Sequence, residues 1–368
     1  MEQIVERHAS RLILLGGFLG AGKTTFMLRL AGILTGEGNT VALITNDQGE
    51  QLVDSEFARA AGYEVGEVSG SCFCCNFSEF INNIDAIILK VNPDYIIAEP
   101  VGSCTDLVST VIAPLEKFHR RKAVLHSFLV LADGLRFAGE YGYQDLDEKE
   151  TAGSVLLSHQ IKEAPVVLIN KCDLLTEAQK ASAFKSLERL NSSARFILLS
   201  ASTGEGFEEV MRLLRGDPMD THSLTSVDID YDVYAKAEAE YGWYNGSWDL
   251  KFSKPEDPSA LGIFIMQSFY NLDLNEVAHA KIQLLTELGS MKISFVMGVI
   301  RADESAMLIP ESDSISVLLN IRAKTSPQNI EDHVAELLEG IGREFQCETE
   351  NYKCNSLIPG APKPTYRF

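Results

Sequence analysis

Residues 11–25 read RLILLGGFLGAGKTT, an apolar run followed by the pattern GxxxxGK[ST]. The run predicts a buried strand, and the residues from Lys23 onward predict a helix. Glycines between a strand and a helix let backbone N–H groups curl around phosphate oxygens, while the N-terminus of the helix adds positive potential. The stretch therefore predicts a phosphate-binding loop, because the pattern is complete and stands in the strand-to-helix context that it requires.

Each residue type in this loop has a distinct expected role. Lys23 would reach the β- and γ-phosphates, and the Thr24 hydroxyl would bind Mg²⁺. We expect Lys23 to be exposed and to contribute little to packing. The residues expected to contact the nucleotide are Gly17, Gly20, Ala21, Gly22, Lys23, Thr24 and Thr25.

From residue 11 to about 215 the sequence alternates between apolar runs and amphipathic stretches of helical length, and residues 1–215 are expected to form one domain. Strands are predicted at 11–15, 40–45, 94–98, 123–132, 166–170 and 195–200, and helices at 23–34, 77–89, 177–190 and 206–214. Several runs are apolar almost throughout, as in strands that are buried on both faces of a parallel sheet. The pattern predicts an α/β fold, namely a P-loop NTPase domain with a mostly parallel sheet.

The remaining residues predict a second, smaller domain. Residues 216–258 are acidic and indicate a linker that ends in a hairpin around Asn245 and Gly246. Trp243 and Trp248 lie there, and a small apolar cluster is favoured over a partner-binding patch. From 259 to 368 we predict a strand at 261–269, a helix at 275–287, strands at 293–300 and 314–323, a helix at 330–345 and a short final strand. This order is a ferredoxin-like βαββαβ α+β domain.

Asn170-Lys171-Cys172-Asp173 follows the strand predicted at 166–170. A carboxylate at Asp173 can accept hydrogen bonds from N1–H and the 2-amino group of guanine, whereas adenine offers neither donor. Lys171 would pack over the base, and Asn170 would brace the phosphate loop. Ser200 and Ala201 end the next strand, where a backbone N–H could meet guanine O6. The set predicts that GTP is bound in preference to ATP.

Two acidic segments are candidates for the Mg²⁺ site and the hydrolytic step. Asp47 follows the second predicted strand and is the first choice for a Mg²⁺-linked carboxylate, with Glu50 as the second. Glu99 ends the strand at 94–98, where it could hold a Mg²⁺-bound water, and the Gly102 N–H could bond the γ-phosphate. An ordinary polar loop at Asp47 remains the alternative.

Three of the seven cysteines crowd into Cys72-Phe73-Cys74-Cys75. In an extended segment, Cys72 and Cys74 point to the same side, and Cys75 adds a third thiolate if the chain turns. Three sulfurs leave a tetrahedral site with an open position for water, a carboxylate or a receiving protein. Thiolates favour Zn²⁺, Cu⁺, Co²⁺ or Ni²⁺ over Mg²⁺. A redox pair or buried inert cysteines are the alternatives.

Composition limits the classes of partner. The formal net charge is −20, which argues against nucleic acid and anionic membranes, since both need a basic surface. No apolar run reaches the length of about 18 residues that a membrane span requires. We therefore expect a cytoplasmic protein, in which clustered cysteines indicate metal or redox chemistry.

The order of these motifs resembles the CobW-type metallochaperone GTPases, relatives of UreG and HypB, over about residues 11–215. The resemblance rests on GFLGAGKTT, the acidic loop that contains Asp47, with Asp54 beyond it, then CxCC, ExxG, NKxD and the segment His159-Gln160-Ile161. It implies a low-turnover GTPase that binds Zn²⁺, Co²⁺ or Ni²⁺ at CxCC and delivers the metal. It also implies that Lys23, Asp47 and Glu99 serve catalysis.

The resemblance further implies a client metalloenzyme or a cofactor-assembly protein as the partner, and it leaves a homodimer open. An alternative function is a GTPase that acts as an assembly or regulatory factor for a cobalamin-dependent or other metalloenzyme. In that case the CxCC segment would be structural or redox-active. Nucleotide-sensitive binding of a transition metal separates the two functions, because only a metallochaperone requires it.

Overall fold

The structure, a computed structural model, describes residues 9–47, 58–59, 62–69, 71–120, 122–138, 152–271, 277–296, 298–302 and 309–368. The chain divides into two compact units. The first comprises residues 1–48, 62–237 and 362–368, and the second comprises residues 49–61 and 238–361. The boundary at 237/238 lies inside the segment from 216 to 258 that was predicted as a linker. None of the helices in the described residues combines the length and the apolar character needed to cross a bilayer.

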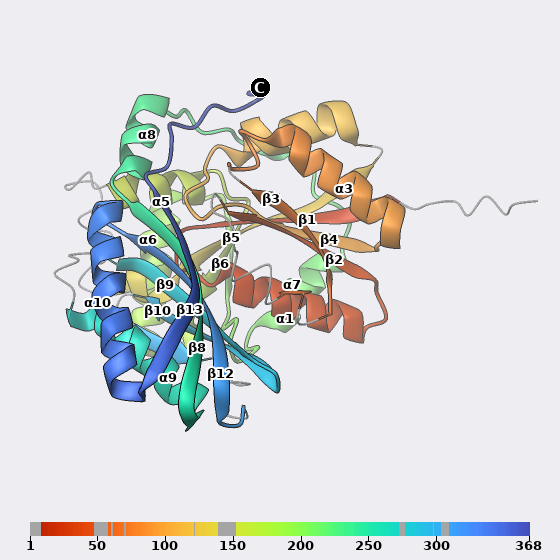
Figure 1. The fold of residues 1–368 in the computed structure, drawn as a ribbon. Coiled ribbons are helices and arrows are strands. Elements are labelled where there is room, and N and C mark those ends of the chain that lie inside the picture. Colours follow the sequence, from red (N-terminus) through yellow and green to blue (C-terminus); the bar gives the residue numbers. More distant parts are fainter. Residues whose placement is uncertain are drawn as a thin grey trace, which may run out of the picture. The chain divides into compact units, whose positions relative to one another are not determined.

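The first unit is built on a seven-stranded sheet with the order β3-β2-β4-β1-β5-β6-β7 (Figure 1). Each pair of neighbouring strands is parallel. The strands are β1 (Ser10–Gly17), β2 (Val41–Asp47), β3 (Glu64–Ser69), β4 (Tyr95–Glu99), β5 (Ala123–Asp133), β6 (Val166–Asn170) and β7 (Arg195–Leu198). The predicted parallel α/β fold is confirmed, and six of these strands were predicted; β3 was not.

Helices cover both faces of this sheet, which explains why its central strands are apolar over most of their length. Helix α3 lies on one face, and α1 and α7 lie on the other (Figure 1). The helices are α1 (Lys23–Gly36), α3 (Phe77–Val91), α4 (Gly134–Ala138), α5 (Ala152–Lys162), α6 (Glu177–Leu190), α7 (Phe207–Leu214) and α8 (Tyr231–Ala239), with π-helical turns η1 (Val108–Ile112) and η2 (Leu115–His119). The predicted helices correspond to α1, α3, α6 and α7.

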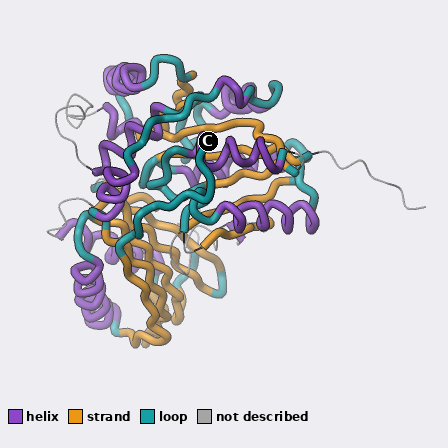
Figure 2. The backbone as a smooth tube through the Cα atoms, turned by 90° about the horizontal axis from the view of Figure 1, so that it is seen from above, coloured by secondary structure: helices purple, strands orange, loops and turns teal. Residues whose placement is uncertain are grey.

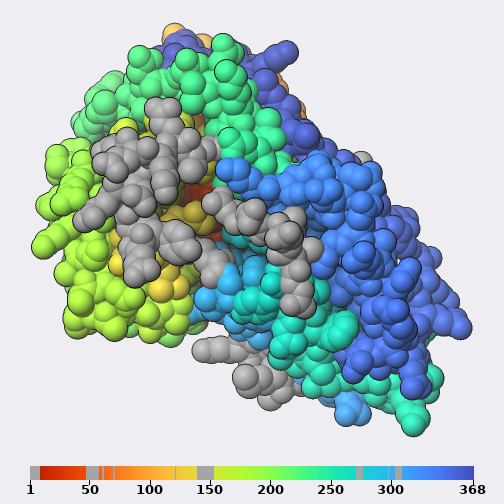
Figure 3. Space-filling model, turned by 90° about the vertical axis from the view of Figure 1, so that its left-hand side faces the viewer, coloured from red at the N-terminus to blue at the C-terminus, as the bar shows by residue number. Residues whose placement is uncertain are grey.

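The second unit is a six-stranded antiparallel sheet with the order β11-β10-β9-β12-β8-β13. Its strands are β8 (Gly242–Glu256), β9 (Val277–Thr286), β10 (Gly289–Val296), β11 (Val299–Ala302), β12 (Ser312–Ala323) and β13 (Cys347–Leu357). Helices α9 (Pro258–Ser268) and α10 (Pro327–Phe345) cover one face (Figure 2), and Figure 3 shows their outer surfaces in teal and blue. The order β8-α9-β9-β12-α10-β13 is βαββαβ, as predicted, but it begins earlier than predicted, because β8 lies in the segment that was predicted as a linker. β10 and β11 extend the sheet beyond β9.

Two elements of this unit were predicted with the wrong secondary structure. Residues 261–269 were predicted as a strand, but they lie mainly in α9, where Asp257 caps the helix by accepting the N–H of Ser259 at 2.8 Å. Residues 275–287 were predicted as a helix, but β9 runs through them, and alternate residues of β9 face the core. The apolar run in α9 conceals its helical period, and the Ala, Lys and Gln residues of β9 favour helix until the neighbouring strands pair with it.

The predicted hairpin at Asn245-Gly246 is also wrong, because both residues lie within the single strand β8. A Cβ atom on Gly246 would lie 2.4 Å from the Tyr244 hydroxyl, so the glycine makes room for that ring. Asn245 is held across the sheet by Asn320, whose amide donates to it at 2.9 Å. Both tryptophans are buried, in agreement with an apolar packing role.

Candidate functional site

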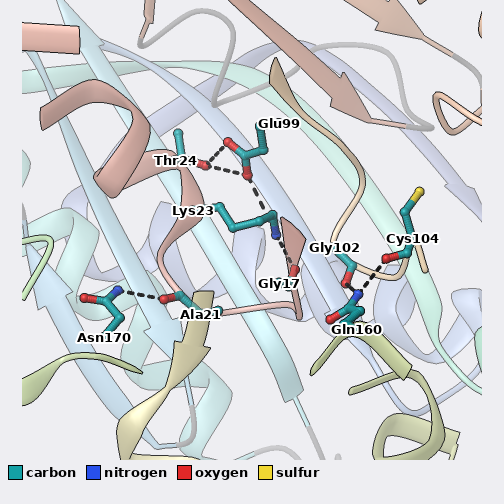
Figure 4. Close-up of polar contacts among 9 residues, drawn as sticks. All are labelled: Gly17, Ala21, Lys23, Thr24, Glu99, Gly102, Cys104, Gln160 and Asn170. Carbon is teal, nitrogen blue, oxygen red and sulfur yellow. Dashed lines mark hydrogen bonds and ion pairs between the residues drawn. The ribbon is translucent and has the colours of Figure 1, made fainter. Parts of the chain in front are cut away.

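The phosphate loop joins β1 to α1 in the first unit. Gly22 adopts φ 93° at the start of α1, and a Cβ atom there would lie 2.4 Å from Asn170 Nδ2. The Asn170 amide donates to the Ala21 carbonyl at 2.7 Å, so the end of β6 touches the loop directly (Figure 4). This close approach leaves no room for a side chain at position 22, which explains the glycine.

Lys23, Thr24 and Glu99 lie together at the carboxyl ends of β1 and β4 (Figure 4). Thr24 Oγ1 lies 2.9 and 3.1 Å from the two Glu99 carboxylate oxygens and donates to this carboxylate. Lys23 Nζ donates to the Gly17 carbonyl at 2.9 Å and lies 3.8 Å from Glu99 Oε1. The expectation that Lys23 is exposed is wrong, since only 7% of it is accessible. The arrangement brings an ammonium, a hydroxyl and a carboxylate to one point.

The loop that follows Glu99 packs against the phosphate loop. A Cβ atom on Gly102 would lie 2.6 Å from Leu19 Cδ2 and 3.2 Å from the Leu19 backbone nitrogen, so the two loops are in close contact. Gln160 of α5 is buried and donates to the carbonyls of Gly102 at 3.0 Å and of Cys104 at 2.8 Å (Figure 4). One side chain therefore fixes this loop from Gly102 to Cys104.

The segment after β6 presents Asp173 to solvent. Asn170 Oδ1 accepts the Lys171 N–H at 2.8 Å, and Lys171 has a left-handed backbone with φ 67°. The Lys171 ammonium is held 2.6 Å from the buried carboxylate of Asp133 at the end of β5. Asp173 follows in the turn η4 (Cys172–Leu174) and is exposed. This geometry fixes the backbone and leaves the Asp173 side chain accessible to a ligand.

The Ser200-Ala201 turn lies beside Asn170, since the Ala201 N–H donates to Asn170 Oδ1 at 2.8 Å. Arg29 of α1 holds the same turn, since its Nε donates to the Ala201 carbonyl at 2.7 Å. Ser200 is buried beside it. The Ser200-Ala201 turn is thus tied to both the phosphate loop and the segment of Asp173.

Asp47 and Glu50 are the two acidic candidates near β2. The structure describes only the backbone of Asp47. Asp47 ends β2, two residues beyond Thr45, which pairs with Glu99 of β4. Glu50 and Asp54 lie outside the described residues. The position of Asp47 on the strand next to Glu99 keeps it as a candidate for the same metal ion.

Three thiols converge in the turn that precedes α3. The Cys72 sulfur lies 2.8 Å from the Cys74 sulfur and 3.2 Å from the Cys75 sulfur, and the last pair is 3.8 Å apart. Sulfur atoms around tetrahedral zinc are separated by about 3.8 Å, given a Zn–S distance of about 2.3 Å. The segment is not extended as predicted. It turns, with the N–H groups of Cys75 and Asn76 donating to the Cys72 carbonyl at 3.0 and 2.9 Å, and the turn brings Cys75 to the other two thiols.

Neighbouring residues hold this turn in place. Asn46, next to Asp47 in β2, donates to the Ser71 carbonyl at 2.8 Å and accepts the Phe73 N–H at 3.0 Å. The Phe73 ring is buried and stacks on Phe80 of α3 with centroids 4.4 Å apart. The end of β2 and the cysteine turn are therefore linked by one buried amide.

The three thiols of the cysteine turn differ in pKa. Hydrogen bonds from Cys104, Cys74 and Cys75 hold the pKa of Cys72 well below its usual range. The hydrogen bond with Cys104 is the largest cause that raises the pKa of Cys74, and the bond with Cys72 raises that of Cys75 to about 11. The cluster therefore favours a thiolate at Cys72 that is stabilised by its neighbours.

Sequence reasoning missed two residues of this site, Asp133 and Cys104. Asp133 could have been recognised from the sequence, because it is the last residue of a strand, and the other polar candidates also lie at the carboxyl ends of strands. Cys104 lies five positions after Glu99 and had no local pattern that joined it to the cysteine turn.

Residues 362–368, here called the tail, lie against the cysteine turn and α8, as the dark blue segment beside α8 shows (Figure 1). The Lys363 N–H donates to the Cys75 sulfur at 3.1 Å, and Thr365 donates to the carbonyls of Cys74 and Cys75 at 2.8 and 3.0 Å. The Tyr366 ring meets Phe77 edge-on with centroids 5.6 Å apart, and Arg367 pairs with buried Asp106 at 2.8 Å. The tail therefore covers the outer side of Cys75.

We predict that Tyr366→Ala increases severalfold the rate at which maleimide modifies Cys75 in the metal-free protein. Loss of the aromatic contact should raise the population of locally detached tail, because such openings are governed by few contacts. Mass spectrometry would follow each cysteine separately. Exposed Cys354 serves as an internal reference, and Tyr270→Ala, at a half-exposed tyrosine of the second unit, serves as the control. An unchanged rate at Cys75 would show that the tail does not protect it.

Comparisons with known proteins agree with this geometry. The family model of the CobW/HypB/UreG nucleotide-binding domain matches residues 11–198. The chain is 24% identical over 215 residues to zinc-regulated GTPase metalloprotein activator 1 of Dictyostelium discoideum, covering 50% of this chain and 44% of that protein. It is 27% identical over 176 residues to the zinc chaperone YeiR of Escherichia coli, covering 47% and 50%. The chain thus matches about half the length of each relative.

Solved structures give weaker similarity. HypB of Helicobacter pylori, in complex with nickel, is 16% identical with a TM-score of 0.42, and the match covers 58% of this chain and 92% of that one. The family assignment rests instead on the family model, whose match spans more than half of the chain and contains the phosphate loop, the cysteine turn, Glu99 and the segment Asn170–Asp173. This chain belongs to the CobW/HypB/UreG family of nucleotide-binding domains.

Proposed function

We propose that this protein is a GTP-hydrolysing metallochaperone that binds a transition metal at Cys72, Cys74 and Cys75 and transfers it to a client metalloprotein. The observation that carries the proposal is the convergence of three thiols in a turn bonded to the end of β2. Three cysteines within 4.8 Å of one another form a soft donor set that suits a transition metal and not Mg²⁺. In this proposal the metal is the cargo of the protein.

The names of the relatives favour zinc as the cargo. One is a zinc-regulated GTPase metalloprotein activator and two are zinc chaperones. A Zn–S distance of about 2.3 Å in a tetrahedral site is compatible with sulfur separations of 2.8 to 3.8 Å after a small expansion. Cobalt and nickel accept similar donors and remain competitors in a binding assay.

GTP is the proposed nucleotide, with Mg²⁺ as its companion ion. The exposed Asp173 carboxylate would bind the guanine edge, while the Gly17–Thr24 loop would surround the phosphates. Thr24 and Glu99 supply the hydroxyl and carboxylate oxygens that Mg²⁺ prefers, and Asp47 is a further candidate. When bound, Mg²⁺ would neutralise charge on the phosphates. Lys23 would stabilise the charge that develops on the γ-phosphate during hydrolysis.

Nucleotide and metal should influence each other's affinity. The phosphate loop contacts the loop that contains Gly102, and β2 contacts the cysteine turn through Asn46. A γ-phosphate that orders one of these segments would also reshape the thiol cluster. Because linkage is reciprocal, each ligand would change the affinity for the other by the same factor.

We expect the zinc affinity to differ between the GTP-analogue and GDP forms by about 5- to 150-fold, the usual range of such coupling. Competition with a chromophoric chelator would measure it. Cys74→Ser should remove the difference together with most of the binding, whereas Cys354→Ser, on β13 of the second unit, should preserve both. Equal affinity in both nucleotide forms would refute the chaperone mechanism and favour a structural metal. A Cys72–Cys74 disulfide without metal binding would favour redox chemistry.

A further inference from the structure

We propose that Cys104 is a fourth metal ligand, which completes a four-thiolate site with Cys72, Cys74 and Cys75 and responds to the bound nucleotide. The inference rests on the proposed function, because it takes the cysteine turn to be the metal site. Three cysteines leave one position of a tetrahedral site open, and the Cys104 thiolate would fill it.

Cys104 lies close to two of the clustered cysteines. The Cys104 side chain forms hydrogen bonds with the thiols of both Cys72 and Cys74. These three cysteines are buried, with 1%, 4% and 2% of each residue exposed respectively. Isolated buried cysteines pack as small apolar side chains. Cys104 instead meets two of the three clustered thiols from a separate segment, so the four cysteines together offer the ligand set of a closed zinc site.

Access to the cluster from outside is restricted on the side of Cys75. The tail covers the cluster beside Cys75, where Lys363 donates its N–H to the sulfur. Cys104 meets the cluster on the side of Cys72 and Cys74, both of which are buried. With the tail in place, an internal thiol reaches the open position more readily than a group from a receiving protein.

The loop that holds Cys104 is in contact with the phosphate loop. The loop begins at Glu99, whose carboxylate accepts from Thr24, and passes Gly102, which packs on Leu19 of the phosphate loop. It continues through a turn in which the Cys104 N–H donates to the Val101 carbonyl at 2.9 Å. Gln160 holds the carbonyls of Gly102 and Cys104 with one amide (Figure 4).

A shift of this loop would therefore move the Cys104 sulfur relative to the other three. Among the described residues, the cysteines whose sulfur atoms all lie within 4.8 Å of one another are Cys72, Cys74 and Cys75, without Cys104. In this proposal Cys104 binds the metal in one nucleotide form and withdraws in the other. A three-thiolate ion with an open position is then ready for transfer, since the receiving protein can supply the fourth ligand.

X-ray absorption spectroscopy of the zinc-loaded wild-type protein tests the ligand count without any substitution. We expect four sulfur neighbours in one nucleotide form and three sulfurs with one lighter atom in the other. Three sulfurs in both forms would overturn the proposal. Four sulfurs in both forms would overturn its nucleotide response.

Chelator competition with Cys104→Ser provides the second measurement. We expect at least a tenfold loss of zinc affinity in the form that has four sulfurs, because loss of even a second-shell partner costs about 10- to 100-fold. The difference between nucleotide forms should shrink accordingly, and Cys354→Ser should leave both quantities unchanged. Wild-type affinity in Cys104→Ser would overturn the fourth ligand and leave the proposed function intact. A wild-type protein that binds no zinc would overturn both.

Discussion

Asp173→Asn is expected to weaken GTP binding by roughly 10²- to 10⁴-fold. A carboxylate at this position accepts two hydrogen bonds from guanine, and hydrogen bonds to charged groups contribute about 1.5–3 kcal/mol each. The asparagine side chain places an N–H donor opposite the 2-amino group of guanine, which is also a donor. One of the two hydrogen bonds to guanine is therefore lost, and a repulsive contact replaces it. Asp173 is exposed beside a rigid backbone that Asn170 and Lys171 hold in place, so the substitution should not disturb the fold.

The same variant should accept xanthine nucleotides, because xanthine has an oxygen where guanine has the 2-amino group. Calorimetric titration with GTP and XTP would measure both effects. Glu177→Gln is the matched control, since it makes the same carboxylate-to-amide change at an exposed position of α6. Unchanged GTP affinity in Asp173→Asn would remove this residue from the base-binding site.

Lys23→Ala is expected to lower the rate of GTP hydrolysis by about 10²- to 10³-fold at saturating GTP and Mg²⁺. This is the usual loss when one preorganised group that stabilises developing charge is removed. Because Lys23 is buried and lies 3.8 Å from Glu99, its removal also takes away an ion-pair partner of that carboxylate. We therefore expect some loss of thermal stability as well.

Phosphate release gives the rate, and thermal unfolding shows whether the variant is folded at the assay temperature. Lys90→Ala is the control, because it removes a lysine from the exposed ion pair with Glu64 and should cost at most about 1 kcal/mol. Turnover at the wild-type rate in folded Lys23→Ala would contradict the role of this lysine in hydrolysis.

Local patterns were sufficient for the first unit. The apolar strand 11–15, the glycines that follow it and the helix from Lys23 each carry their own signal, and the central strands are apolar over most of their length. The parallel α/β fold, the three clustered cysteines and the residues of the phosphate loop therefore follow from short stretches. Strand β3 was missed because its sequence EVGEVS contains two acidic residues and a glycine.

The second unit shows where local patterns fail. Asp257 and Pro258 are good signals for the start of α9, but the apolar run after them suits a strand equally well. Strand β9 contains good helix formers, and only its pairing with β10 and β12 decides its conformation. Gly246 is typical of a turn until the Tyr244 ring is seen to occupy the space above it.

Short stretches of sequence were enough to identify candidate residues for binding phosphate, guanine and a soft metal, because the candidates for each ligand lie close together in the chain. Only the tertiary structure could show that Lys23 is buried, that Asn170 joins the phosphate loop to the Ser200-Ala201 turn, and that Cys104 meets the other cysteines. These contacts join segments 30 to 150 positions apart, as in the bond from Asn170 to Ala21, which are separated by 149 positions. A parallel sheet places the ends of its strands at one edge, and no periodicity along the chain records which loops meet there.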